Sequence, residues 1–270
     1  KLVPVGLNPL KSSIETLLHA IMPQSFIIHS HSLDVIRETV IPDNYKNISK
    51  IMSGYKWTYV NYMQPGKDLA KEVFSKIKKD NFDVIILFNH GLIVGGESSI
   101  EVFNKHNKIV KGFFRESRKE AKVDLNKLND ILSFLNKETS FKWRLPNSKI
   151  VHSLATDDWS FDLAKMNPLY PDHVVFCDYK ACCIKNIHLS KLDEVMSPNS
   201  KYLIIKDFGV FLNQKSNFAT EEMLEGQAYI NLSIPKGTKV KTLTNLECLD
   251  LMELDSEKYR IDLIKKVSSK

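Results

Sequence analysis

Two histidines separated by one residue, His29 and His31, are the first side chains in this sequence whose types and spacing could do chemistry. They end the segment 25–31, whose apolar residues predict a short strand. Residues two apart on a strand point to the same face, so both imidazoles could reach one metal ion from a rigid element. The pair alone is a weak signal for a metal site.

His90 offers a third imidazole at a comparable place in the chain. It follows the apolar segment 83–88, which predicts a buried strand, and it precedes Gly91. Functional groups gather at strand ends in parallel sheets, and three neutral imidazoles that leave coordination positions open are typical of catalytic zinc. On spacing alone, a hydrogen-bonded core histidine is the better interpretation of His90.

A carboxylate and two serines lie just upstream of the H-x-H strand. Ser12 and Ser13 precede a predicted helix at 14–20, where they are expected as N-caps. Glu15, in the first turn, is either an ordinary capping carboxylate or an acid/base beside the metal. Because a helix N-terminus attracts anions, the two serines could also seat a phosphate.

The elements that must position these residues alternate between strands and helices, which predicts an α/β fold. Further strands are expected at 57–60, 90–94, 174–176 and 202–205, and further helices at 33–40, 67–79, 97–122 and 220–231. A polar stretch at 137–149 predicts a boundary between a domain at 1–140 and a smaller α/β lobe at 150–270.

The second lobe contains a weak internal sequence repeat of the first. The segment 84–92 aligns without a gap on 202–210: each is a strand, a Gly turn, a short apolar run and then a helix. The pattern indicates either a degenerate repeat or a chance recurrence. In a repeat, Phe208 stands where His90 stands.

If the second lobe is a decayed copy of the first, the segment 171–179 would stand opposite 23–31. Cys177 and Tyr179 would then replace the two strand histidines, and tyrosine is a poor zinc ligand. The second lobe is therefore expected to carry neither a metal nor a catalytic base, and to cover a sheet edge or wall the active-site cleft.

The composition is that of a soluble globular protein. Of 270 residues, 43% are hydrophobic and 26% are charged, the net charge is +6, and no apolar run approaches the ~20 residues of a membrane span. The basic residues at 105–122 alternate with apolar ones at helical spacing, which favours an amphipathic helix with a solvated basic face over a nucleic-acid interface. The four cysteines form neither a disulfide framework nor a metal motif, so a reduced, cytoplasmic protein is expected.

Several of these segments, taken together in order, resemble the class II aldolase/adducin family. The resembling stretches are Leu7–Pro9, Ser13–Ala20, His29–His31, Pro65–Gly66, Asn89–Leu92 and Gly95–Ser98. Within the family, the chain is most similar to the aldolase part of rhamnulose-1-phosphate aldolase/alcohol dehydrogenase fusion proteins. The resemblance is strong over roughly residues 7–110 and weak beyond them.

The resemblance implies a class II aldolase-like sheet flanked by helices, with zinc, or another divalent metal, held by His29, His31 and His90. It implies Glu15 as the catalytic residue and phosphate contacts from Ser12 and Ser13. The implied reaction cleaves a ketose 1-phosphate of the rhamnulose or fuculose type to dihydroxyacetone phosphate and an aldehyde, in a homo-oligomer. Two alternatives stay open: a sugar-phosphate epimerase or dehydratase of the same superfamily, and a non-catalytic adducin-like interaction module.

Overall fold

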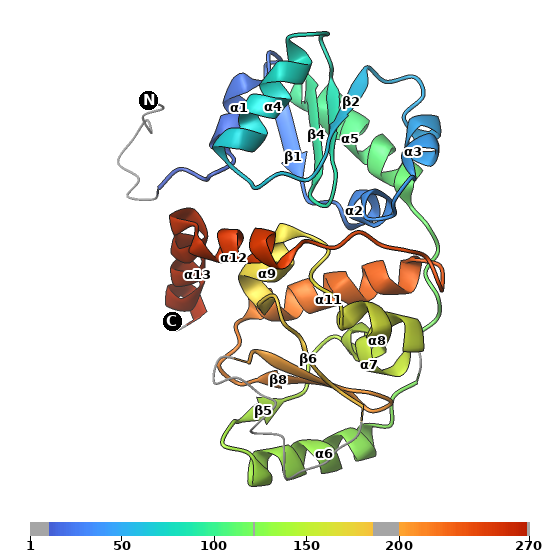
Figure 1. Cartoon of the computed structure of the whole chain (residues 1–270), viewed down its shortest axis with the longest axis vertical. Coiled ribbons are helices and arrows are strands. Elements are labelled where there is room, and N and C mark those ends of the chain that lie inside the picture. The colour runs from blue at the N-terminus through green and yellow to red at the C-terminus, as the bar shows by residue number, and fades with distance from the viewer. Residues whose placement is uncertain (1–10, 121, 186–199, 269–270) are drawn as a thin grey trace.

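The computed structural model describes residues 11–120, 122–185 and 200–268, which form two α/β halves stacked along the long axis (Figure 1). The first half contains α1 (Thr16–Ile21), β1 (Phe26–Ser30), α2 (Leu33–Thr39), α3 (Tyr45–Ile51), β2 (Trp57–Val60), α4 (Lys67–Ile77), β3 (Val84–Leu87), β4 (Gly91–Gly96) and α5 (Ser99–Phe113). The second half contains α6 (Leu125–Glu138), β5 (Trp143–Arg144), the 3-10 helix η1 (Lys149–His152), α7 (Ser153–Thr156), α8 (Asp158–Ala164), α9 (Pro171–Cys177), β6 (Cys182–Ile184), β7 (Tyr202–Ile205), β8 (Gly209–Asn213) and α11 (Phe218–Ser233). Helices α12 (Asn245–Glu253) and α13 (Asp255–Ser268) follow.

The first sheet has the strand order β1-β4-β3-β2 and is covered by helices on both faces. Strand β4 is antiparallel to both neighbours, and β2 is parallel to β3. Successive side chains of β3 point to opposite faces of the sheet. Val84 and Ile86 pack against α2, α3 and α5, while Ile85 and Leu87 pack against α1 and α4. Burial on both faces explains why this strand is a continuous apolar run.

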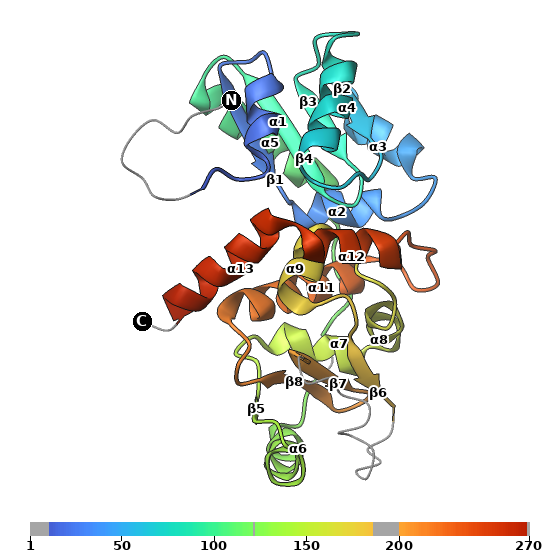
Figure 2. The same cartoon turned by 60° about the vertical axis from the view of Figure 1, so that its left-hand side comes forward.

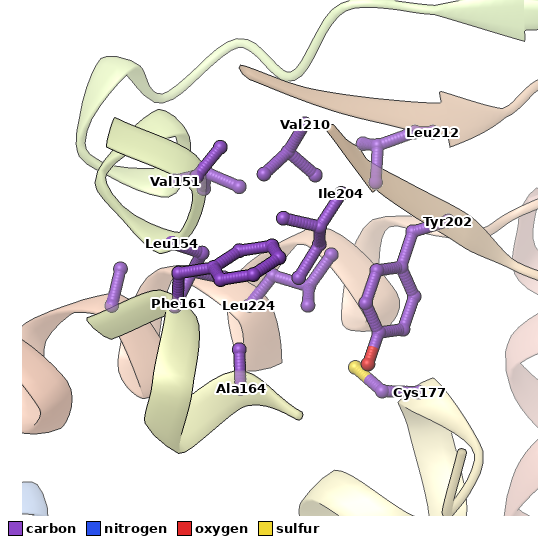
Figure 3. Packing of buried hydrophobic residues seen from close by; sticks show 12 residues of the cluster. Val151, Leu154, Phe161, Ala164, Cys177, Tyr202, Ile204, Val210, Leu212 and Leu224 are labelled. Carbon is purple, nitrogen blue, oxygen red and sulfur yellow. The ribbon is translucent and has the colours of Figure 1, made fainter. Parts of the chain in front are cut away.

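The second sheet repeats this arrangement with the order β5-β8-β7-β6. Its strands pair in the same sense, with β8 antiparallel to both neighbours and β6 parallel to β7. One face packs on α6, and the other packs on η1, α7, α8 and α11. Figure 3 shows the second of these cores, in which Phe161 lies beside Ile204 and Leu224. The expected α/β class with a second α/β lobe is confirmed.

The hairpin register supports a structural repeat. Val84 pairs with Val94 and Leu87 with Gly91 in the first sheet, as Tyr202 pairs with Leu212 and Ile205 with Gly209 in the second. The two tight turns also share a left-handed residue, Asn89 with φ 55° and Asp207 with φ 66°. Strand order, pairing sense and register thus agree along the segments that the sequence aligned.

One part of the expected alignment is wrong. Residues 174–176 lie within helix α9, so the segment 171–179 is no counterpart of the H-x-H strand. The topological counterpart of β1 is β5, the strand that pairs with β8. Pro171 starts α9 without losing a helical hydrogen bond, and a short, fully buried apolar run does not distinguish a helix from a strand.

The helix expected at 97–122 is shorter than predicted. Helix α5 ends at Phe113, whose carbonyl oxygen accepts a hydrogen bond from the buried guanidinium of Arg37. Beyond it, Arg118 donates to Asp157 (2.8 Å) and to the carbonyl of Asn231 (2.9 Å). Arg118 therefore links this segment to the second half of the chain.

The domain boundary at 140–150 stays a prediction. Both α6 and β5 pack with the second sheet. None of the described helices is long and apolar enough to span a membrane.

Candidate metal centre

Four donor side chains converge where the first sheet meets α1. His29 lies in β1, His31 follows that strand, His90 lies in the turn between β3 and β4, and Glu15 is the N-cap of α1. Strand β1 pairs with β4 so that Ser30 lies opposite Leu92, which brings the carboxyl end of β1 beside the turn that carries His90. The sheet thus joins ligands that are about 60 residues apart in sequence.

The donor atoms surround a common point. Glu15 Oε1 lies 3.1 Å from His29 Nε2, 3.3 Å from His31 Nε2 and 2.9 Å from His90 Nε2. His31 Nε2 lies 3.2 Å from that of His29 and 3.0 Å from that of His90. His90 is almost fully buried, whereas about a fifth of the Glu15 and His31 side chains is exposed.

Hydrogen bonds behind two of the imidazoles fix their orientation. His29 Nδ1 lies 3.0 Å from the carbonyl oxygen of Leu92, which can only accept, so Nδ1 carries the hydrogen and Nε2 presents its lone pair to the cluster. His31 Nδ1 lies 2.5 Å from Oδ2 of Asp172. A carbonyl or carboxylate behind a histidine is the usual way to orient a metal-binding imidazole. His90 Nδ1 is buried without a partner among the described residues.

The turn that carries His90 is fixed by its neighbours. Gly91 has φ 153°, and a Cβ there would lie 2.1 Å from the carbonyl oxygen of Ser30, so only glycine permits this approach. The side chain of Asn89 donates to the carbonyl oxygens of Leu169 (2.9 Å) and Lys241 (2.8 Å). The second half of the chain therefore helps to hold the position of His90.

The electrostatics of the cluster favour a positive charge at its centre. Burial raises the pKa of Glu15, but its close contacts with three histidines outweigh burial and hold that pKa well below its ordinary value. Burial lowers the pKa of His31, yet its bonds to Asp172 and Glu15 raise it to about 10. Burial lowers the pKa of His90 to about 4, so this imidazole is neutral and able to act as a ligand.

The donor set fits a divalent metal better than a purely hydrogen-bonded cluster. A tetrahedron with ligands about 2.0–2.1 Å from zinc has edges of about 3.3–3.4 Å, close to the separations found here. Without an ion, the Nε2 atoms of His29, His31 and His90 would compete for a single carboxylate oxygen. Glu15, His29, His31 and His90 could therefore hold a metal ion, and no second such group occurs in the part of the chain that the structure describes.

The two serines occupy a different place from the one expected. The N-cap of α1 is Glu15, and Ser13 Oγ instead accepts a hydrogen bond from the Glu15 backbone N–H (3.2 Å). The expectation of a serine N-cap is wrong because the chain makes one turn at residues 14–15 before the helix begins. Ser12 and Ser13 are exposed and line a cavity against α13, with Ser13 two residues before Glu15.

Sequence reasoning missed the contribution of the second half. Asp172 in α9 bonds His31, and Arg260 in α13 donates to Asp172 (3.2 Å) and to Glu257 (2.8 Å). Burial raises the pKa of Asp172, but its hydrogen bond with His31 lowers it to about 2. No local pattern marks these residues, because their role depends on a contact between positions 141 residues apart.

A comparison with protein families finds a match in the first half of the chain. Residues 2–111 match the family described as the Class II Aldolase and Adducin N-terminal domain. The resemblance noted from the sequence is thereby confirmed over this part of the chain. The remaining residues lie outside that match.

Among curated proteins, the uncharacterized oxidoreductase YuxG of Bacillus subtilis (strain 168) is 31% identical over 102 residues. The match covers 37% of this chain and 15% of the length of YuxG. Two solved structures are similar over 37% of this chain. One is the N-terminal class II aldolase domain of a conserved Thermoplasma acidophilum protein (36% identity, 46% of that chain, TM-score 0.34). The other is an aldolase II superfamily protein from Pseudomonas syringae (24% identity, 41% of that chain, TM-score 0.31).

Proposed function

We propose that this protein is a zinc-dependent aldolase that cleaves a ketose 1-phosphate of the rhamnulose or fuculose type to dihydroxyacetone phosphate and an aldehyde. The observation that carries the proposal is a carboxylate, Glu15, placed within 3.3 Å of three imidazole nitrogens inside a class II aldolase/adducin domain. An interaction module would have no need of such a buried ligand set, which is difficult to maintain without an ion.

His29, His31 and His90 would hold the metal, with Leu92 and Asp172 orienting two of them. A divalent ion bound there supplies a Lewis acid for the substrate carbonyl. Zinc is the proposed ion because neutral imidazoles with one remaining position are its usual catalytic ligands.

Glu15 would be the acid/base. Its depressed pKa keeps the carboxylate ionised, and its exposed edge lets substrate reach it. When the carbon–carbon bond breaks, the aldehyde leaves. The electron pair of the broken bond stays on the other fragment. Glu15, ionised at the start, would take up the proton that the hydroxyl on the departing carbon loses as it becomes the aldehyde carbonyl, and would return a proton to the carbon that keeps the electron pair. Ser12 and Ser13 are proposed to contact the substrate phosphate, and the active form is proposed to be a homo-oligomer.

A product assay tests the function. The purified chain is incubated with zinc and with rhamnulose 1-phosphate or fuculose 1-phosphate, and dihydroxyacetone phosphate is measured by a coupled reduction. We expect its release from wild type and a roughly 10²–10⁴-fold lower turnover in Glu15→Gln. An epimerised or dehydrated sugar phosphate as the product would identify one of the two enzymatic alternatives instead. The absence of turnover together with the absence of bound metal would favour the adducin-like module.

A further inference from the structure

A cavity of about 340 Å³ lies between the segment before α1 and helix α13. Its polar lining comes from Lys11, Ser12 and Ser13 on one side and from Tyr259 and Arg260 on the other. Figures 1 and 2 show α13 at the boundary between the two halves, where it follows α12 and lies near α9. Helix α13 lies outside residues 2–111, so the family match says nothing about this wall.

The cavity adjoins the metal centre. Its floor includes Ile14, the residue directly before Glu15. On the opposite wall, Arg260 donates to Asp172, which bonds the imidazole of His31. The cavity is therefore one residue along the chain from Glu15 and, through Asp172, one hydrogen-bonded side chain from His31.

Hydrogen-bond donors dominate the polar lining. Lys11 Nζ lies 5.3 Å from the centre of the Tyr259 ring and pairs with no carboxylate among the described residues. Arg260 has five N–H donors, and Glu257 and Asp172 occupy two of them. Its side chain is 41% exposed, so donors remain available to a ligand. The one carboxylate in the lining is Asp255.

The lining offers two cations, Lys11 and Arg260, and three hydroxyl-bearing side chains, Ser12, Ser13 and Tyr259. Such a set is suitable for an oxyanion with several acceptor oxygens.

We propose that this cavity receives the phosphate monoester of the substrate, and that Lys11 and Arg260 supply its positive charge. The inference rests on the proposed function for the identity of the substrate. Its new element is α13: the second half of the chain would contribute a specificity-determining arginine to a site built on the first half. The guanidinium can pair with two phosphate oxygens, whereas Lys11 acts as a point charge.

Calorimetric titration of inorganic phosphate into the full chain tests the proposal. The titration is done with metal-loaded protein and with chelator-treated protein, because phosphate can also bind a metal directly. The variants are Lys11→Gln and Arg260→Gln. Lys137→Gln is the matched control, since that side chain is 81% exposed and lies in the second half on α6. We expect each cavity variant to weaken phosphate binding roughly 10- to 100-fold in both protein forms, the usual effect of losing one charge-assisted hydrogen bond. The control should stay within about twofold of wild type.

Equal phosphate affinity in wild type and both cavity variants would overturn the proposal. The proposal would also be overturned if only Arg260→Gln lost phosphate affinity and this variant lost its metal as well. Arg260 would then act only through Asp172. KM measurements separate this inference from the proposed function. If ketose phosphates are cleaved with an unchanged KM in both variants, only the inference fails. If phosphate binds as expected and no sugar phosphate is cleaved, the anion site stands and the proposed function fails.

Discussion

His31 and Asp172 face each other across the boundary between the two halves, with Nδ1 and Oδ2 2.5 Å apart. His31 follows the edge strand β1, whereas Asp172 lies in the first turn of α9. Arg260 holds the second carboxylate oxygen of Asp172. The second half therefore orients one of the proposed metal ligands.

Asp172→Asn should weaken metal binding while leaving the fold intact. The amide keeps the shape but removes the charge that holds the His31 ring, a loss that typically lowers metal affinity about 10- to 100-fold. Competition with a chromophoric chelator measures the affinity. Asp162→Asn, a surface carboxylate paired only with Lys165 in an i,i+3 contact, is the control. Equal affinity in both variants would show that His31 needs no partner.

Gly91→Ala should damage both stability and metal binding. A Cβ at this position overlaps the carbonyl of Ser30 and pushes apart the strand end and the turn that carry His31 and His90. Gly54→Ala is the control, because Gly54 also has a positive φ but its added Cβ meets nothing within 4 Å. Denaturant unfolding should show about 1 kcal/mol of destabilisation in Gly54→Ala and about 2–3 kcal/mol more in Gly91→Ala. A similar loss of unfolding free energy in the two variants would mean that the end of β1 moves to accommodate the added Cβ.

Acid should destabilise the second half through His152. Burial lowers the pKa of this side chain to about 4, and its Nδ1 accepts the backbone N–H of Val210 (3.1 Å). The unfolded chain, with a histidine pKa near 6.5, binds the proton first, so the contribution is complete above about pH 6.5 and is lost as the pH falls towards 4. Between pH 7 and pH 5 the free energy of unfolding should drop by about 2 kcal/mol from this residue. His152→Asn keeps an acceptor without titrating, so its stability should fall less over that interval. An identical pH dependence in both proteins would contradict the assignment.

The second half should bind no metal. Cys177 is buried, donates to the carbonyl oxygen of Thr220 (3.4 Å) and has a pKa raised by burial, so it is a poor source of thiolate. Cys177→Ala should leave the metal content of the chain unchanged. A stoichiometry near two per chain, with the second metal lost in this variant, would show that the assignment is wrong.

The sequence predicted what depends on local pattern. Strand periodicity located β1 and β3, and the gapless alignment of two hairpins anticipated the common topology of the two sheets. The H-x-H spacing anticipated that His29 and His31 share a face. The family resemblance, more than spacing, selected His90 and Glu15 as their companions.

The features that could not be predicted from the sequence depend on contacts between distant segments. Helix α9 has the same apolar character as a buried strand, and only its packing against α11 and α12 distinguishes the two. Asp172 and Arg260 gain their roles from the way the halves pack. The end of α5 depends on Arg37, which reaches a carbonyl 76 positions along the chain.

The metal content of the purified chain shows whether His29, His31 and His90 hold a divalent ion. Elemental analysis of wild type and His90→Ala, after dialysis against metal-free buffer, compares the site with and without its most deeply buried ligand. We expect about one divalent ion per chain in wild type, with zinc predominant, and almost none in a His90→Ala variant that keeps the far-ultraviolet circular dichroism of wild type. Full occupancy in the variant, or a folded wild type that neither contains nor takes up a divalent ion, would contradict it.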